Sequence, residues 1–150
     1  MATRTGSFAA SVSANKLKIE LEINKKCYEI SRELFLQIVE LTPTKVGPVH
    51  GPYATGVLSN NWFPVDGPGY STDEVDTRVP NGQASVDRIK TLQGTQFFRK
   101  DGEVTLSNNI KYAYRAEYAG WPEADNPRWK GAKPYHMVSL SLILVSARYK

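Results

Sequence analysis

The chain has 150 residues, of which 41% are hydrophobic and 23% are charged. This length is typical of one domain, and a core of this size forms without metals or disulfides. The apolar runs are too short and too interrupted to cross a bilayer, and no secretory signal opens the chain. We therefore expect a single domain over residues 1–150 that folds in the cytoplasm.

The net charge of +4 is distributed unevenly along the chain. Residues 1–26 carry five basic against two acidic residues, and residues 121–150 again carry five against two. Residues 27–120 carry nine against eleven. Basic ends on a slightly acidic body are compatible with an acidic partner or DNA, but no five-residue basic cluster exists, which favours a role in solubility.

The N-terminal part of the chain predicts a flexible arm, followed by one long helix. Residues 1–14 are mostly small and polar, as in an arm that only a neighbour would order. Residues 15–41 then carry a helical stripe of apolar residues in steps of three and four: Ile23, Cys27, Ile30, Leu34, Ile38 and Leu41. Residues 16–23 alternate as a strand would, but no turn residue separates them from the stripe, so we assign them to the helix. Pro43 ends it.

Cys27 is the only cysteine and lies on this stripe. It has no second thiol for a disulfide within the chain or for a metal cluster. Because free cysteine is among the most frequently buried residue types, we predict a small core residue here.

The middle of the chain, residues 43–83, is rich in loops and holds six of the nine prolines. Val57 to Phe63 is its best candidate for a strand or a helical turn. Gly67 to Gly82 predicts a long exposed loop, and a loop of this size in a compact domain is usually functional or disordered.

The C-terminal part predicts short elements. Ala84 to Leu92 has apolar residues at three-residue steps and predicts a helix. Thr95 to Arg99 and Glu103 to Leu106 predict a hairpin that turns at Asp101-Gly102. Asn109 to Tyr118 is helix-like and aromatic.

The last element, Met137 to Val145, is apolar, and its partial alternation does not decide between strand and helix. The order of the predicted elements indicates an α+β fold, in which a long N-terminal helix packs on a small antiparallel sheet with short helices and long loops.

Few residues suggest catalysis or metal binding. The two histidines, His50 and His136, stand in no zinc-binding spacing, and the phosphate-loop, dinucleotide and nucleophile-elbow motifs are missing. Asp73, Glu74 and Asp76 could hold a divalent cation, but their spacing matches no calcium loop, which favours a solvated loop.

An aromatic segment next to basic residues raises two further possibilities. Glu117 lies among tyrosines and could act as an acid, although a buried, hydrogen-bonded carboxylate that holds two elements together is the stronger interpretation. Aromatic residues beside basic ones could also stack on single-stranded nucleic acid; these are Tyr112, Tyr114 and Tyr118 with Lys111 and Arg115, and Trp121 and Trp129 with Arg128 and Lys130. Because Tyr114 and Tyr118 share one helix face, they are more simply core or interface residues.

Two passages form motifs. The first is Leu41-Thr42-Pro43, followed by Thr55-Gly56-Val57-Leu58-Ser59-Asn60-Asn61-Trp62. The second is Asn108-Asn109-Ile110-Lys111-Tyr112-Ala113, continued by Glu117-Tyr118-Ala119-Gly120. Together they resemble the tail-completion or neck protein family of long-tailed phages, which includes the tail component named for minor tail protein Z.

The likeness spans residues 15–146 in order, with three departures. Lys133 to Val138 resembles the family's Pro-x-Gly-Met-Val before a final helix, with His136 in place of the glycine, and this favours a helix at residues 137–146. Residues 44–54 form an insertion, and the Asp and Arg that commonly flank Thr-Gly are missing.

The matched residues have structural roles by their chemistry. We expect a backbone conformation closed to other residues at Gly56, a Trp62 that fills the gap beneath the long helix, and Asn108 and Asn109 capping a helix near Ile110. The motif residues are Thr42, Pro43, Thr55, Gly56, Leu58, Asn61, Trp62, Asn108, Asn109, Tyr112, Glu117 and Tyr118.

The resemblance implies a structural virion protein without catalytic activity or cofactor. It implies a ring of six copies at the head–tail junction, between the portal-side connector and the tail terminator or tail tube, assembled in the host cytoplasm. The basic ends would contact DNA in the lumen. The alternatives are a small DNA-binding accessory protein and an enzyme with an unrecognised site.

Overall fold

The structure of the chain is a computed structural model that describes residues 4–44, 55–66, 69–92, 103–120 and 130–150. Its fold is α+β and mostly helical, which confirms the predicted fold class. The elements in chain order are α1 (Arg4–Leu41), α2 (Val57–Asn60), β1 (Trp62–Asp66), η1 (Pro80–Gly82), α3 (Gln83–Thr91), β2 (Val104–Asn108), η3 (Arg115–Ala119) and α4 (Met137–Arg148).

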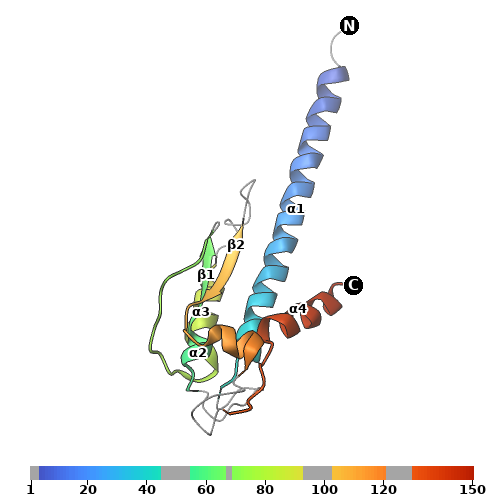
Figure 1. The fold of residues 1–150 in the computed structure, drawn as a ribbon. Coiled ribbons are helices and arrows are strands. Elements are labelled where there is room, and N and C mark those ends of the chain that lie inside the picture. Colours follow the sequence, from blue (N-terminus) through green and yellow to red (C-terminus); the bar gives the residue numbers. More distant parts are fainter. Residues whose placement is uncertain (1–3, 45–54, 67–68, 93–102, 121–129) are drawn as a thin grey trace.

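Helix α1 has 38 residues, and its N-terminal part extends beyond the other described elements (Figure 1). It ends at Leu41, as Pro43 predicted, but it begins at Arg4, so the expected arm is helical from that residue onward. Alanine, a strong helix former, recurs in this segment, and no proline interrupts it. We call residues 4–25 of α1 the stalk, because this part rises above the body of the domain.

Two residues of the predicted core stripe of α1 are exposed. Cys27 is exposed, and Ile23 is 56% exposed, so the prediction of a buried cysteine is wrong. The body covers only the lower part of the helix, where Ile38 is buried and Leu34 and Leu41 are partly buried. The stripe is continuous in sequence, but burial stops where the body ends.

The sheet has two antiparallel strands, with Trp62 opposite Asn108 and Asp66 opposite Val104. The sequence predicts a different partner for residues 103–106, a hairpin with residues 95–99. Residues 95–99 and the turn that follows them lie outside the described residues. The described partner of β2 is β1, about forty residues earlier in the chain. The segment expected as one strand or turn, residues 57–63, divides into α2 and the start of β1.

The body packs around one core between α1, α3 and α4. Helix α3 confirms the predicted helix at residues 84–92, and α4 confirms the helix that the family resemblance favoured at residues 137–146. The buried apolar residues of this core are Phe35, Ile38, Val39, Leu58, Trp62, Ile89, Leu92, Ile110, Ala116 and Met137.

The predicted long loop at residues 67–82 is irregular where it is described: residues 69–79 form no helix or strand, and Pro80–Gly82 make one 3-10 turn. The aromatic segment forms a turn that leads into the π-helical turn η3, a geometry that is rare in proteins. Among the described helices, none has the length and apolarity that a bilayer crossing needs.

Candidate functional site

The C-terminal end of α1 is joined to β1 through Thr42 and Trp62, two of the motif residues. The indole Nε1 of Trp62 donates to the Thr42 hydroxyl at 2.9 Å, and that hydroxyl donates to the carbonyl of Ile38 at 2.7 Å. Trp62 is 6% exposed, and its backbone N–H donates to the hydroxyl of Ser85 in α3 at 3.0 Å. Trp62 therefore fills the space beneath the long helix and connects three elements.

Gly56 starts the short helix α2 with a φ of +90°, the left-handed conformation expected of it. Its carbonyl accepts from the backbone N–H and the side-chain amide of Asn60, at 3.0 and 2.8 Å. A side chain here would also place its Cβ 3.1 Å from the carbonyl oxygen of Val79. Of the neighbouring motif residues, Thr55 is exposed and Leu58 is buried in the core.

Asn60 and Asn61 hold the long loop against the body. The Asn61 side chain donates to the carbonyl of Val75 and accepts from its N–H, both at 2.7 Å. The Asn60 amide donates to the carbonyl of Val79 at 2.8 Å. These side chains satisfy backbone groups of a segment that has no regular backbone pairing. They hold the loop against the body.

The second motif meets the first at this loop and at α2. Asn108 donates to the carbonyl of Leu58 at 2.9 Å and accepts from the N–H of Ile110 at 3.2 Å, as a capping side chain does. Asn109 has a different role from the expected cap, because its amide donates to the carbonyls of Ser71 and Asp73.

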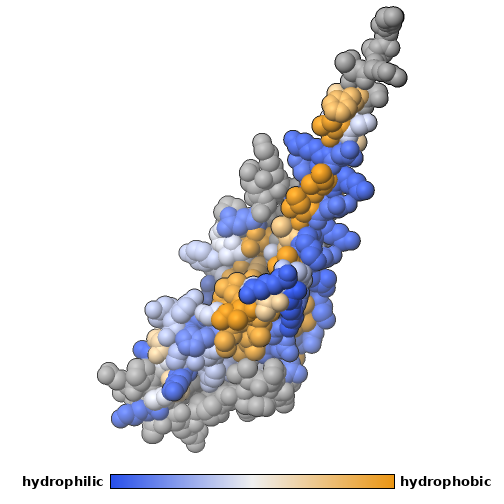
Figure 2. Space-filling model, turned by 90° about the vertical axis from the view of Figure 1, so that its right-hand side faces the viewer, coloured by the Kyte–Doolittle hydropathy of each residue, from blue (hydrophilic) through white to orange (hydrophobic). Residues whose placement is uncertain are grey.

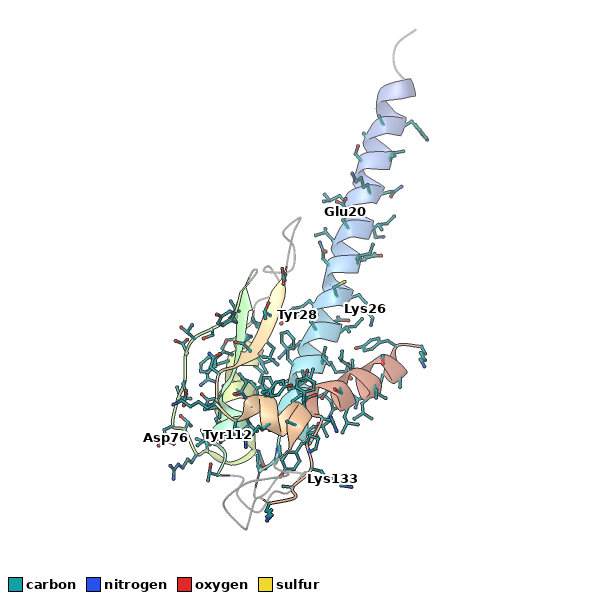
Figure 3. All side chains as sticks on the ribbon, in the orientation of Figure 1. Glu20, Lys26, Tyr28, Asp76, Tyr112 and Lys133 are labelled. Atoms are coloured by element: carbon teal, nitrogen blue, oxygen red, sulfur yellow. The ribbon has the colours of Figure 1, made fainter. Side chains whose placement is uncertain are left out.

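The acidic residues of the loop are solvent-facing. Asp73, Glu74 and Asp76 are exposed, and Asp76 pairs with Arg78 at 3.2 Å. Within the described ranges, no three potential metal ligands gather at one place. Figure 3 places Asp76 on the same side of the body as Tyr112; burial of Tyr112 raises its pKa, and the negative charge of Glu74 adds to this effect.

Glu117 is buried, at 4% exposed, and binds the first turn of α4. Its carboxylate accepts from the backbone N–H groups of Val138 and Ser139, at 2.9 and 3.1 Å, and from the Ser139 hydroxyl at 2.9 Å. The open N–H groups and the dipole of a helix N-terminus favour such an anion. The interpretation of Glu117 as a carboxylate that holds two elements together agrees with this geometry.

The aromatic residues around Glu117 point outward. Tyr114 and Tyr118 are 69% and 56% exposed, with ring centroids 5.4 Å apart, so they are not core residues. The adjacent Lys111 and Arg115 are exposed as well. Trp121, Trp129, Arg128 and His50 lie outside the described residues.

The C-terminal end of α4 is fastened to α1 by a polar cluster that sequence reasoning missed. Arg148 pairs with Glu33 and donates to Gln37 at 3.0 Å, and the Tyr149 hydroxyl donates to Glu33 at 2.6 Å. The Nζ of Lys26 lies 4.9 Å from the centroid of the Tyr149 ring. More than a hundred residues separate Glu33 from its partners, so no local pattern marks this cluster.

The stability that this cluster contributes is expected to depend on pH in two directions. Hydrogen bonds from Tyr149 and then Arg148 lower the pKa of Glu33 below its ordinary value of 4.5, so its contribution is present above that pH and is lost as the pH falls through the lowered pKa. The bond to Glu33 raises the pKa of Tyr149 above 10.0, so that contribution is present below that pH and is lost as the pH rises through the raised pKa.

Thermal melting between pH 7 and 3 measures the acid side of this effect. The fall in melting temperature is expected to be smaller in Glu33→Gln, which has no carboxylate to titrate at that position. Glu20→Gln on the stalk is the matched control and is expected to retain the wild-type pH dependence. Equal pH dependence in Glu33→Gln and wild type would contradict a role for Glu33.

Comparison of the chain with protein-family models, with curated proteins and with solved structures finds no match. Six of the motif side chains bond to backbone groups or to each other and connect α1, α2, β1, the long loop and α4: those of Thr42, Asn61, Trp62, Asn108, Asn109 and Glu117. These bonds hold elements of the described chain together.

Proposed function

We propose that this chain is a structural virion protein of a phage head–tail junction, a neck or tail-completion subunit that joins the connector to the tail tube. The observation that carries the proposal is that the two motifs behind the family resemblance meet in the fold. Asn108 of the second motif bonds to Leu58 of the first at 2.9 Å, fifty residues away in the chain. Two short motifs that meet in this way support a shared fold more strongly than either alone.

In this proposal the chain acts by binding, and not by catalysis. A ring of six copies closes through head-to-tail contacts, in which one surface of each copy meets a different surface of the next. The portal-side connector contacts one side of the ring, and the tail terminator or tail tube contacts the other. The fixed loop at residues 69–79 offers backbone and acidic side chains to such neighbours, and basic residues near the chain ends are available to DNA in the lumen.

The test is a joining assay with particles from a phage genome in which the gene for this chain is interrupted. Filled heads and finished tails are expected to accumulate separately, and added purified chain is expected to restore joined, infectious particles. Electron microscopy counts the joined fraction. Addition of Trp62→Ala, which weakens the body, is expected to restore fewer. Heads and tails that join normally without the chain would contradict the proposal.

A second candidate is a small DNA-binding accessory protein, which the exposed pair of Tyr114 and Tyr118 beside Lys111 and Arg115 favours. Aromatic rings over basic side chains can stack on single-stranded DNA. Binding by phosphate contacts weakens by orders of magnitude between low and moderate salt. Salt-sensitive binding that Tyr114→Ala removes, from a chain that forms no ring, would favour this function over the first.

A further inference from the structure

A groove lies between α1 and the C-terminal end of α4. Five of the six residues that line it come from one side of α1, where residues three and four apart lie close together, and the sixth directly follows α4. The lining residues are Tyr28, Glu29, Arg32, Glu33, Leu36 and Tyr149. The volume of the groove is about 380 Å³, within the range of about 300 to 1,000 Å³ that is typical of sites for small molecules. Figure 2, which faces the C-terminal end of α4, shows hydrophilic surface beside apolar surface there.

Arg32 is a charged side chain of this groove that the described part of its own chain leaves without a partner. Its Nε is buried and has no hydrogen-bond partner among the described residues. No described carboxylate lies within ion-pair distance of it, and Glu29, one turn earlier in α1, pairs with Lys26 instead. Buried donors are nearly always bonded, and a guanidinium that is partly removed from water needs an anion close by. The anion for Arg32 therefore has to come from outside the described residues.

The carboxylates of the groove are already neutralised by cations of the same chain. The Nζ of Lys26 lies 3.6 Å from a carboxylate oxygen of Glu29, and Arg148 pairs with Glu33. Three basic side chains thus stand against two acidic ones, and the positive charge of Arg32 is left over. One negative charge balances it, and a second would be repelled by Glu29 and Glu33. A carboxylate therefore suits the groove better than a phosphate monoester, which carries about 1.5 to 2 negative charges at pH 7.

The rest of the groove is suited to an apolar group. Tyr28 lies on the side of α1 that faces the body (Figure 3), and its hydroxyl donates to the carbonyl of Leu92 at 2.8 Å. The Tyr149 hydroxyl donates to Glu33 at 2.6 Å. With both hydroxyls bonded, the two tyrosines offer ring surface to the groove, and Leu36 adds aliphatic surface. Small-molecule sites combine apolar and aromatic walls of this kind with a few polar groups that fix the ligand.

We propose that this groove binds a small organic acid, in which one carboxylate is attached to an aromatic or aliphatic group. The carboxylate pairs with the guanidinium of Arg32, whose planar fork of donors matches a carboxylate better than an ammonium group does. The apolar group packs on Tyr28, Leu36 and Tyr149. Every residue of the site belongs to one chain, so this binding goes beyond the proposed ring and does not depend on it.

Titration with three related probes tests the chemistry of the ligand. The probe 3-phenylpropionate has both the carboxylate and the apolar ring, 3-phenylpropan-1-ol has the ring without the charge, and propionate has the charge without the ring. In amide NMR spectra, 3-phenylpropionate is expected to shift the signals of residues 28–36 and 148–150 at millimolar concentration. The alcohol and propionate are each expected to bind at least tenfold more weakly.

Variants of Arg32 test the residue that holds the carboxylate. Arg32→Gln is expected to bind 3-phenylpropionate at least tenfold more weakly than wild type, and Arg32→Lys is expected to fall between the two, because it keeps the charge but loses the fork. Arg78→Gln is the matched control. It removes an exposed arginine that pairs with Asp76 at 3.2 Å outside the groove, and it is expected to leave binding unchanged. In thermal melting, the probe is expected to raise the melting temperature of wild type but not that of Arg32→Gln.

Three results would overturn the proposal. Groove signals that do not move with 3-phenylpropionate would show that the site does not take a small organic acid. Equal binding of the acid and the alcohol, or equal binding by wild type and Arg32→Gln, would show that the guanidinium does not hold the ligand. Without probe, Arg32→Gln is expected to melt no lower than wild type, because no described residue bonds to the Nε that it removes. A clearly lower melting temperature would show that Arg32 has a structural partner instead.

Discussion

Replacement of Glu117 by alanine is expected to lower the free energy of unfolding by about 3 kcal/mol. The carboxylate accepts three hydrogen bonds from the first turn of α4, and the N–H groups that it leaves are at a partly buried helix end. Urea unfolding measures the loss. Hydrogen exchange is expected to accelerate in α4 more than in α3, because only α4 loses its anion.

Two variants control this result. Glu117→Gln keeps the shape of the side chain and one acceptor oxygen but loses the charge, so a smaller loss is expected. Glu20→Ala removes an exposed glutamate that pairs with Lys16 at 3.8 Å, and a change below about 0.5 kcal/mol is expected from such a surface pair. A loss in Glu117→Ala no larger than in Glu20→Ala would show that the carboxylate does not hold α4.

Replacement of Trp62 by alanine is expected to lower the free energy of unfolding by about 4 kcal/mol, more than replacement of Glu117 by alanine. The ring is buried at the meeting point of α1, β1 and α3, and its removal leaves a cavity there. Chemical unfolding measures the change, and the near-ultraviolet spectrum reports the loss of fixed packing.

Trp62→Phe separates the packing from the hydrogen bond. It removes the 2.9 Å bond to Thr42 and part of the apolar contact, so a cost of about 1 kcal/mol from the bond plus a packing cost below that of Trp62→Ala is expected. Tyr114→Ala removes an aromatic ring that is 69% exposed and is expected to leave stability almost unchanged. Equal losses for Trp62→Ala and Tyr114→Ala would contradict the role of Trp62.

The elements that the sequence predicted well are those with local signals. The end of α1 followed from Pro43, and α3 followed from apolar steps of three residues. The helix α4 did not follow from periodicity, because Leu140, Leu142 and Leu144 are exposed and the alternation that they create resembles a strand. The family resemblance favoured the helix, and the structure agrees.

The features that the sequence did not predict depend on distant partners. Cys27 fits a core stripe by its spacing, and its exposure depends on where the body stops, which no pattern in α1 records. The pairing of β2 with β1 and the bond from Tyr149 to Glu33 join segments far apart in the chain. Glu117 was identified as a linking carboxylate, but nothing local indicated that the first turn of α4 is its partner.

The number of residues in the stalk of α1 sets how far the N-terminal tip lies from the body. At about 1.5 Å per residue, residues 4–25 extend about 33 Å along the helix axis. Removal of eleven residues would shorten this reach by about 16 Å and rotate the tip by only about 20°, and removal of nine would turn it through about half a circle. The distance of the N-terminal tip from the body can therefore be changed with little rotation about the helix axis, or together with a half turn, by choosing how many residues are deleted.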